Sequence, residues 1–333
     1  MGGSTGYAIG IDVGGTSIKL GLVCCDEWNI TARTVIHGKH YETPDAFLTS
    51  IPAAIEKICA EAHVRREQVL GIGIGLPGCV DSLRGIVKDI TNLPNWRGEF
   101  TIKKELESLL GIPTYIDNDV NLMSIAELVR GAGNGCRNML CVTLGTGVGG
   151  AIIIDGKLYR GSTLSAGEIG HITLFKDGEP CNCGNWGCLE RYVGNAAIVN
   201  RTVRAISESS LKKDILMKSI HNDLSRLTPK IICGAAYDGD ELSQHIWEET
   251  GSYIGIVFAA MVNVLNPDKI VVGGGVAQCG NMLFKAIRKT INERAMPVPA
   301  ERVELVPAVL GADAGIYGSA IYSVKTEFHE EIG

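Results

Sequence analysis

Residues 7–23 read YAIGIDVGGTSIKLGLV, and this stretch decides the fold. It consists of an apolar run, a Gly-Gly-Thr turn and a second run in which Ile18, Leu20 and Leu22 set the alternation. Alternation with period two beside a glycine turn is typical of two β-strands joined by a tight loop. The chain is therefore predicted to open with a strand–loop–strand unit.

A second segment repeats this pattern. Residues 139–159 read MLCVTLGTGVGGAIIIDGKLY, which is an apolar strand, a Gly/Thr turn and another apolar strand. The dipeptide Asp155-Gly156 then provides a hairpin turn. Each unit is followed by strands that alternate with helices, as in α/β layers. The sequence thus predicts an internal duplication, with two related α/β halves and no low-complexity tract between them.

The remaining elements follow from apolar spacing, caps and breakers. Thr101 is a candidate N-cap, and Gly111 lies just past the end of that helix. Residues 47–58 have helical spacing, but Pro52 should break or start their helix. The other predicted elements are strands at 70–75, 113–117 and 269–272 and helices at 101–110, 241–265 and 311–322.

Composition limits the classes of function. The 333 residues suffice for two domains, and 45% of them are hydrophobic. A formal net charge of −6 argues against a nucleic-acid-binding protein, which needs a basic face. No apolar run approaches the ~20 residues of a membrane span, and the N-terminal residues do not predict a secretory signal. Of the 11 cysteines, three crowd into residues 181–188 and the others lie in apolar segments, which favours buried thiols in a reducing cytoplasm.

The first glycine turn has the features of a phosphate-binding loop. Asp12, Gly14, Gly15, Thr16 and Lys19 place backbone N–H groups, a hydroxyl and charged groups in one short segment. Successive N–H groups form a nest for anions, and a nearby carboxylate can hold a hydrated Mg²⁺. The alternative is an ordinary β-hairpin with a glycine turn.

Two further glycine loops follow in the second half. Gly145, Thr146 and Gly147 belong to a G-x-G-x-x-G pattern, but a β-like run follows it where a dinucleotide fingerprint needs a helix. A second phosphate-binding hairpin fits better. Three glycines follow a predicted strand and would let an adenine ring lie on the backbone. They are Gly273, Gly274 and Gly275. Three such loops together predict a nucleotide site.

Three cysteines and one histidine have the composition of a structural zinc site. They are His171, Cys181, Cys183 and Cys188. A Cys₃His set is typical of closed tetrahedral zinc, and the histidine favours zinc over an iron–sulfur cluster. The alternatives are buried structural thiols and a core histidine without a ligand.

Polar residues accompany this cluster and the end of a predicted strand. Glu168 precedes His171, Glu190 follows Cys188, and Asn118-Asp119 ends the strand at 113–117. Side chains at the carboxyl ends of parallel strands face the crevice where α/β proteins bind ligands. The alternatives are a helix N-cap role for Asp119, alone or in addition, and solvated loop carboxylates for Glu168 and Glu190.

At this point the chain resembles the ROK (repressor, open reading frame, kinase) family of bacterial sugar kinases over nearly its whole length, and among them it is most like the glucokinases. The motifs that carry the resemblance are DVGGTSIK at 12–19, Asn118-Asp119, LGTGVGG at 144–150, EIGH at 168–171, CNCGNWGCLE at 181–190 and VGGGV at 272–276. Two positions depart from the usual pattern, Val120 after the aspartate and Ala151 after the second loop.

The resemblance implies an actin-like ATPase (ribonuclease H-like) fold, with two duplicated α/β domains around a nucleotide cleft. We expect domains at 1–117, joined by a C-terminal helix at about 311–333, and at 118–310, which carries the zinc loop. Asp119 is implied as the general base. The implied sugar-binding residues are Gly78, Asn118, Asp119, Glu168, His171 and Glu190.

The function that the resemblance implies is phosphorylation of a hexose at O6 by ATP and Mg²⁺, with D-glucose expected as the substrate. N-acetylglucosamine, N-acetylmannosamine, allose and fructose are alternative substrates, and polyphosphate is an alternative donor. A sugar-responsive repressor of the same family is the rival class. It is disfavoured because the first glycine loop begins close to residue 1, which leaves no room for a preceding DNA-binding domain. A homodimer or homotetramer is expected, without nucleic-acid or membrane partners.

Overall fold

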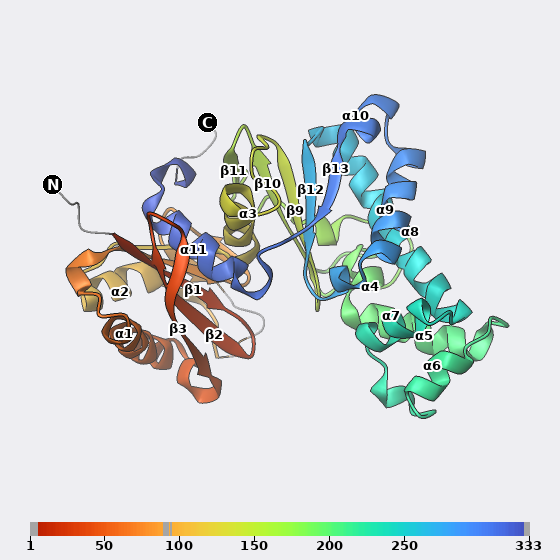
Figure 1. Ribbon diagram of the computed structural model, residues 1–333, viewed down its shortest axis with the longest axis horizontal. Helices are drawn as coiled ribbons and strands as arrows, with labels where there is room; N and C mark the ends of the chain where they lie inside the picture. The colour runs from red at the N-terminus through yellow and green to blue at the C-terminus, as the bar shows by residue number, and fades with distance from the viewer. Residues whose placement is uncertain (1–5, 89–92, 94, 330–333) are drawn as a thin grey trace. The chain divides into compact units, whose positions relative to one another are not determined.

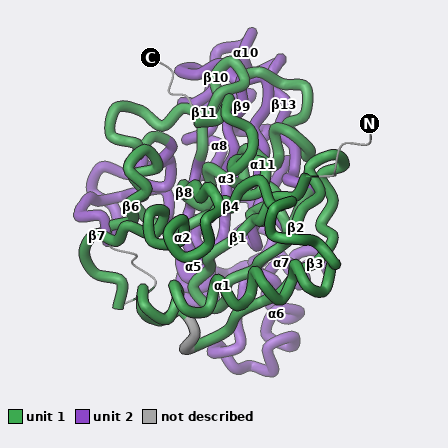
Figure 2. Tube along the Cα trace, turned by 90° about the vertical axis from the view of Figure 1, so that its left-hand side faces the viewer, with its two compact units in different colours: residues 1–137, 151–166, 310–333 green, residues 138–150, 167–309 purple. Residues whose placement is uncertain are grey.

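The computed structural model describes residues 6–88, 93 and 95–329 (Figure 1). The chain divides into two compact units (Figure 2). Unit 1 comprises residues 1–137, 151–166 and 310–333, and unit 2 comprises residues 138–150 and 167–309. Among the described helices, none combines the length and apolar character needed to cross a membrane.

Unit 1 is built on a five-stranded sheet of order β3-β2-β1-β4-β8. Strands β1, β4 and β8 run parallel, whereas β1, β2 and β3 are joined antiparallel. The strands are β1 (Tyr7–Val13), β2 (Ser17–Cys24), β3 (Asn29–His37), β4 (Val69–Leu76) and β8 (Thr114–Asn118). A smaller sheet contains β5 (Cys79–Asp81), β6 (Ile86–Lys88) and β7 (Glu99–Phe100).

The second five-stranded sheet repeats the strand order of the first. Its order is β11-β10-β9-β12-β13, so in both sheets the first strand lies between the second and the fourth. The strands are β9 (Met139–Leu144), β10 (Val148–Ile154), β11 (Lys157–Tyr159), β12 (Lys269–Gly273) and β13 (Glu304–Pro307). The predicted duplication of an α/β half is therefore confirmed, and both predicted strand–loop–strand units form. Strand β10 begins in unit 2 and continues into unit 1.

Both faces of the unit 1 sheet are covered by helices. On one face, α1 (Pro44–Glu61) and α2 (Ile102–Leu110) pack on a core that includes Ile9 and Ile72. On the other face, α3 (Asp119–Arg130) and α11 (Ala314–Val324) pack together, and α11 lies directly on β1 and β4. Glycine makes this close approach possible, because a Cβ at Gly10 or Gly73 would meet the backbone of α11.

Unit 2 is mainly helical outside its strands. Its helices are α4 (Glu190–Val193), α5 (Asn195–Glu208), α6 (Asp214–Ser219), α7 (Pro229–Tyr237), α8 (Glu241–Leu265), α9 (Asn281–Arg294) and α10 (Pro297–Arg302). The longest, α8, packs along α9 and is capped by Asn266, which adopts a left-handed conformation with φ 44°.

Short 3₁₀ segments occur in both units. They are Gly38–Tyr41, Arg66–Gln68, Ile169–His171, Leu224–Arg226, Val276–Cys279, Gly311–Asp313 and Thr326–Phe328.

Several local predictions need correction. Helix α1 runs through Pro52 and begins instead at Pro44, where Thr43 accepts a hydrogen bond from the Ala46 N–H. A proline inside a helix removes one hydrogen bond, but this helix also buries Phe47, Ile51 and Ile58 on the core. Thr101 occupies the N-cap position of α2 without capping it, because its hydroxyl donates to Glu105.

Two further differences concern the C-terminal part and the cysteines. The last predicted helix begins as a 3₁₀ turn and is α-helical only over α11, while residues 330–333 of the expected 311–333 segment lie outside the described residues. Cys233 and Cys279 form a disulfide between α7 and the 3₁₀ segment Val276–Cys279, where free thiols were expected. The thiol of Cys79 is exposed.

Candidate active site and metal site

The sheet of unit 1 brings two predicted site segments to one edge. Asp12 at the end of β1 pairs in register with Gly75 of β4, and Leu76 of β4 pairs with Asn118 of β8. Because β1, β4 and β8 are parallel, their carboxyl ends meet at the same edge. The first glycine loop and the Asn118-Asp119 pair therefore leave the sheet from neighbouring strands.

The first loop carries a carboxylate beside a lysine. The Lys19 Nζ lies 3.6 Å from Asp12 Oδ2 and also donates to the Ala312 carbonyl at 3.1 Å. Burial raises the pKa of Asp12 above its ordinary value, and the nearby Lys19 charge opposes that rise. A bound cation would favour the charged form of this carboxyl. Gly15 and Thr16 at the tip of the loop are exposed, so their polar groups can reach a ligand.

Asn118 and Asp119 lie at the start of helix α3. The Asn118 side chain accepts hydrogen bonds from the backbone N–H groups of Val120 (2.9 Å) and Asn121 (3.3 Å), so Asn118 is the N-cap. The suggestion that Asp119 is the cap is therefore wrong, since it is the first helical residue. Asn118 Nδ2 also donates to the Gly78 carbonyl at 3.3 Å. Three of the predicted sugar-site residues thus lie together.

A buried ion pair, which the sequence did not reveal, supports this corner. Asp117 Oδ2 accepts from Arg160 Nε at 2.8 Å and from Arg160 Nη2 at 2.6 Å. Its Oδ1 accepts from the Asn118 N–H at 2.7 Å and from Asn121 Nδ2 at 2.9 Å. Asp117 and Arg160 are 2% and 4% exposed. This network fixes the residues on both sides of Asn118 and Asp119, so it sets the position of the α3 N-terminus.

The C-terminal segment completes the same network. Arg160 Nη2 also donates to the Phe328 carbonyl at 3.0 Å, and the Arg160 guanidinium lies over the Tyr322 ring. The His329 ring stacks on Tyr115 of β8 with centroids 4.3 Å apart. Burial, followed by the Asp117 charge, raises the pKa of Tyr322, while burial lowers the pKa of His329. Both side chains are therefore neutral near pH 7, and the network's charges are those of Asp117 and Arg160.

In unit 2, the second and third glycine loops lie side by side. Gly145 donates its N–H to the Gly147 carbonyl at 2.9 Å, which closes the turn between β9 and β10. Gly274 has φ +90°, and a Cβ there would meet the backbone of Leu144 just before this turn. Only glycine combines that conformation with such a close approach. The two loops that were predicted to hold nucleotide are thus brought together.

The four predicted metal ligands converge in unit 2. Each offers one ligand atom, and these atoms all lie within 4.8 Å of one another. Cys181 Sγ is 3.6 Å from His171 Nδ1, and Cys183 Sγ is 3.7 Å from Cys188 Sγ. Thiolates bound to one tetrahedral zinc at about 2.3 Å would lie roughly 3.7 Å apart, so the donor set and its spacing fit zinc.

Backbone pairing holds the ligand segments in place. A β-bridge joins Thr173 to Cys188, and the Leu189 N–H donates to the Ile172 carbonyl at 2.9 Å. His171 presents Nδ1 to the cluster, while its Nε2 lies 3.9 Å from Glu168 Oε2. A metal-bound histidine commonly directs its second nitrogen to a carboxylate. Glu168 is exposed and therefore also accessible to a ligand.

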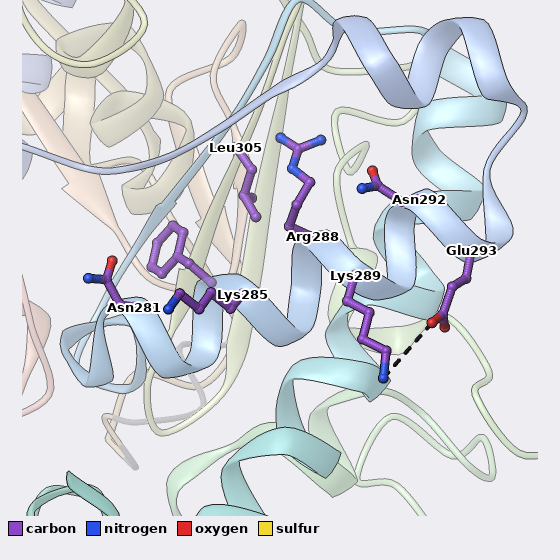
Figure 3. Close-up of a pocket in the computed structure, with 8 residues that line it drawn as sticks. Asn281, Lys285, Arg288, Lys289, Asn292, Glu293 and Leu305 are labelled. Carbon is purple, nitrogen blue, oxygen red and sulfur yellow. Dashed lines mark ion pairs between the residues drawn. The ribbon is translucent and has the colours of Figure 1, made fainter.

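A surface groove of about 590 Å³ lies elsewhere on unit 2, along α9 (Figure 3). The described side chains that line it include none of the predicted site residues. Lys289 and Glu293 form an ion pair on its wall, and Arg288 donates to the Val303 carbonyl at 2.8 Å. Burial lowers the pKa of Arg288. This guanidinium is thus engaged by the protein itself.

The buried ion pair gives a first prediction. Arg160→Met should lower the free energy of unfolding by about 3–5 kcal/mol, because it leaves the Asp117 carboxylate buried without its charge partner. The matched control is Arg137→Met, which breaks an ion pair with Asp155 at 2.7 Å whose side chains are 74% and 66% exposed. Its loss should cost under about 1 kcal/mol. Urea unfolding followed by circular dichroism measures the free energy of unfolding of both variants. Equal losses of stability would contradict the structural role of the Asp117–Arg160 pair.

Comparisons with known proteins place the chain in a family. A family profile described as "ROK family" matches residues 8–326. A glucokinase of Halalkalibacterium halodurans is 36% identical over 321 residues, which cover 94% of this chain and 93% of that protein.

Solved structures give the same picture. A ROK family glucokinase from Streptomyces griseus, in complex with glucose and AMPPNP, is 31% identical and has a TM-score of 0.78, with 96% of this chain and 99% of that chain covered. A ROK family transcriptional regulator, a homologue of the Escherichia coli MLC protein, is 26% identical and has a TM-score of 0.83, with 96% and 78% covered. The fold is the actin-like ATPase fold, and the chain belongs to the ROK family.

Proposed function

We propose that the protein is an ATP-dependent hexose kinase that transfers the γ-phosphoryl group of ATP to O6 of D-glucose. The observation that carries the proposal is the position of Asp119. It begins α3 beside the capping residue Asn118, at the sheet edge where the Asp12 strand also ends. The 36% identity to a glucokinase over 94% of the chain supports the same activity.

Asp119 acts as the general base in this proposal. A sugar hydroxyl is a poor nucleophile, and phosphoryl transfer depends mainly on positioning and on neutralising charge. The Asp119 carboxylate accepts the proton of the attacking hydroxyl, a contribution of about 10²–10⁴-fold. Asn118 fixes the helix start, and Asp117 with Arg160 fixes Asn118, so the base is held by buried groups.

The glycine loops and the first-loop carboxylate hold the nucleotide. Mg²⁺ supplies charge neutralisation at the phosphates, and Asp12 is the group of this chain that would hold it. The loops at 14–16 and 145–147 hold the phosphates. The Gly14 and Gly145 N–H groups already donate within their own turns, so the proposed phosphate donors are the N–H groups of residues 15, 16, 146 and 147. Residues 273–275 leave room for the adenine ring. ATP is the proposed donor, because the Streptomyces griseus glucokinase was solved with AMPPNP.

In this proposal, the residues that donate to or accept from the sugar hydroxyls are Gly78, Asn118, Asp119, Glu168, His171 and Glu190. His171, Cys181, Cys183 and Cys188 would hold a zinc ion, which would fix the orientation of His171 and of the backbone around Glu190. Because all four donors are protein side chains, the ion would have a structural role and would not take part in phosphoryl transfer.

Substitution of the base tests the mechanism. Asp119→Asn preserves shape but cannot accept a proton, so kcat should fall by about 10²–10⁴-fold while the sugar Kd changes little. Asp45→Asn is the matched control, since Asp45 also lies in the first turn of a helix but far along the chain from the site. Coupled ADP-release kinetics with calorimetric sugar binding measure both. Near-normal turnover by Asp119→Asn would refute the role of the base.

Substrate preference tests the identity of the sugar. D-glucose should give the highest kcat/KM, because sites built to bond a hydroxyl discriminate strongly against analogues that leave their polar groups unpaired. N-acetylglucosamine, N-acetylmannosamine, allose and fructose are the comparison set. A clearly higher value for any of them would overturn glucose but keep the sugar kinase. Sugar binding without turnover on any of the five would instead favour a regulator of the same family.

Metal analysis tests the zinc site. We expect one zinc per chain in protein purified without chelator, and Cys183→Ser should lose both the metal and sugar phosphorylation because it opens the tetrahedral set. Cys79→Ser is the control, because this thiol is also exposed but lies outside the cluster. Elemental analysis that finds no zinc in the wild-type protein would rule the site out.

A further inference from the structure

Glu190 contacts the second glycine loop directly. Its Oε2 accepts a hydrogen bond from the Val148 N–H at 3.0 Å. A Cβ placed on Gly147 would lie 2.5 Å from the same oxygen. The carboxylate therefore occupies the space that a side chain at position 147 would need. The glycine at this position is explained by Glu190 as well as by any approach of a phosphate.

The segment that begins with Glu190 holds both ends of the loop. Glu190 opens the short helix α4, and Asn195, two residues after the end of α4, donates its N–H to the Gly145 carbonyl at 2.8 Å. A Cβ on Gly194 would lie 2.9 Å from the Thr146 carbonyl oxygen. Residues 190–195 thus lie against the loop from Gly145 to Val148, through hydrogen bonds at each end.

The segment before His171 also packs against the start of this strand. A Cβ on Gly170 would meet the Val148 carbonyl oxygen, and a Cβ on Gly150 would lie 2.7 Å from Ile169 Cγ1. Val148 is therefore held through its N–H by Glu190 and is packed at its carbonyl against the residue before His171. The start of β10 therefore cannot move far without displacing one of these two segments.

We propose that Glu190 couples the sugar site to the nucleotide loop, as a positioning residue as well as a sugar ligand. One carboxylate oxygen holds Val148, and the other is then available to a sugar hydroxyl. Sugar binding at the second oxygen fixes the rotamer that holds the loop, and an ordered loop presents the carboxylate to the sugar. Each ligand therefore tightens the binding of the other by the same factor. This inference rests on the proposed function.

The nucleotide side of the coupling is tested without sugar. Glu190→Ala removes the charged acceptor of the Val148 N–H, so the Kd for Mg·AMPPNP should rise about tenfold, as expected for loss of a hydrogen bond to a charged group. Glu190→Gln keeps an oxygen at that position and should recover most of the affinity. Glu168→Ala is the matched control, because Glu168 is the other sugar-site carboxylate of unit 2 and has Oε2 near His171. Its nucleotide Kd should stay within about twofold of wild type.

The sugar side is tested without nucleotide. Gly147→Ala places a methyl group against the Glu190 carboxylate, which must move, so glucose binding should weaken several-fold although no sugar-binding group has been replaced. Gly145→Ala is the control in the same loop, because a Cβ there meets nothing within 4 Å. Its glucose Kd should equal that of the wild type. Circular dichroism and melting temperature verify that each variant is folded.

Isothermal titration calorimetry gives all of these constants. In the wild type, glucose should lower the Kd for Mg·AMPPNP. In Glu190→Ala, the ratio of the nucleotide Kd without glucose to the Kd with glucose should fall to about one. Unchanged nucleotide affinity in Glu190→Ala, or unchanged glucose affinity in Gly147→Ala, overturns the proposal. Absence of glucose binding by the wild-type protein would refute the proposed substrate instead. The Kd values of the Glu190 and Glu168 variants for Mg·AMPPNP would then decide, without any sugar, whether Glu190 holds the nucleotide loop.

Discussion

Close approach of one backbone segment to another, at positions where a side chain would not fit, is the constraint on which this structure depends. In unit 1, Gly10 and Gly73 bring α11 directly onto the central strands. That contact returns the C-terminal segment to the end of β8, where Arg160 donates both to Asp117 and to the Phe328 carbonyl. In unit 2, Gly170 brings the segment before His171 onto the Val148 carbonyl, and Gly147 leaves room for the Glu190 carboxylate. The glycines of the motifs are thus packing positions as much as loop positions.

Buried hydrogen bonds hold the half-buried Asp119 on a rigid frame. Asp119 lies in the first turn of α3, but its neighbours Asp117 and Asn118 are fixed by buried or capping hydrogen bonds. Removal of one partner of the buried Asp117–Arg160 pair lowers the free energy of unfolding strongly. The pair therefore keeps Asn118 and the start of α3 in place. The Cys₃His cluster and the bridge between Thr173 and Cys188 provide a comparable frame for Glu190.

Much of the fold could be predicted from the sequence, because strand alternation and glycine turns are local signals. Both strand–loop–strand units and the long helix before Asn266 were predicted, and the four ligand atoms of the Cys₃His set lie close together. The Asp117–Arg160 pair was missed because its partners are 43 residues apart and share no periodicity. The available signal was an aspartate at the end of a strand that was predicted to be buried. The Glu190–Val148 contact uses a backbone donor, which no sequence pattern reveals.

Other differences arise where a local rule competes with burial or with a neighbouring residue. Pro52 was expected to interrupt its helix, but the apolar face of α1 outweighs the loss of one hydrogen bond. Asn118 and Asp119 are both good N-cap residues, so the sequence alone could not place the cap to within one position. The Cys233–Cys279 disulfide joins segments that lie 46 residues apart, and spacing gave no indication of that pairing.

The most direct test of the central claim is a crystal structure of the protein with D-glucose and Mg·AMPPNP. We expect O6 of glucose to lie within hydrogen-bond reach, about 2.6–3.2 Å, of the Asp119 carboxylate and to face the γ-phosphate held by the glycine loops. A complex in which a different hydroxyl, or none, reaches Asp119 while the sugar is bound would contradict it.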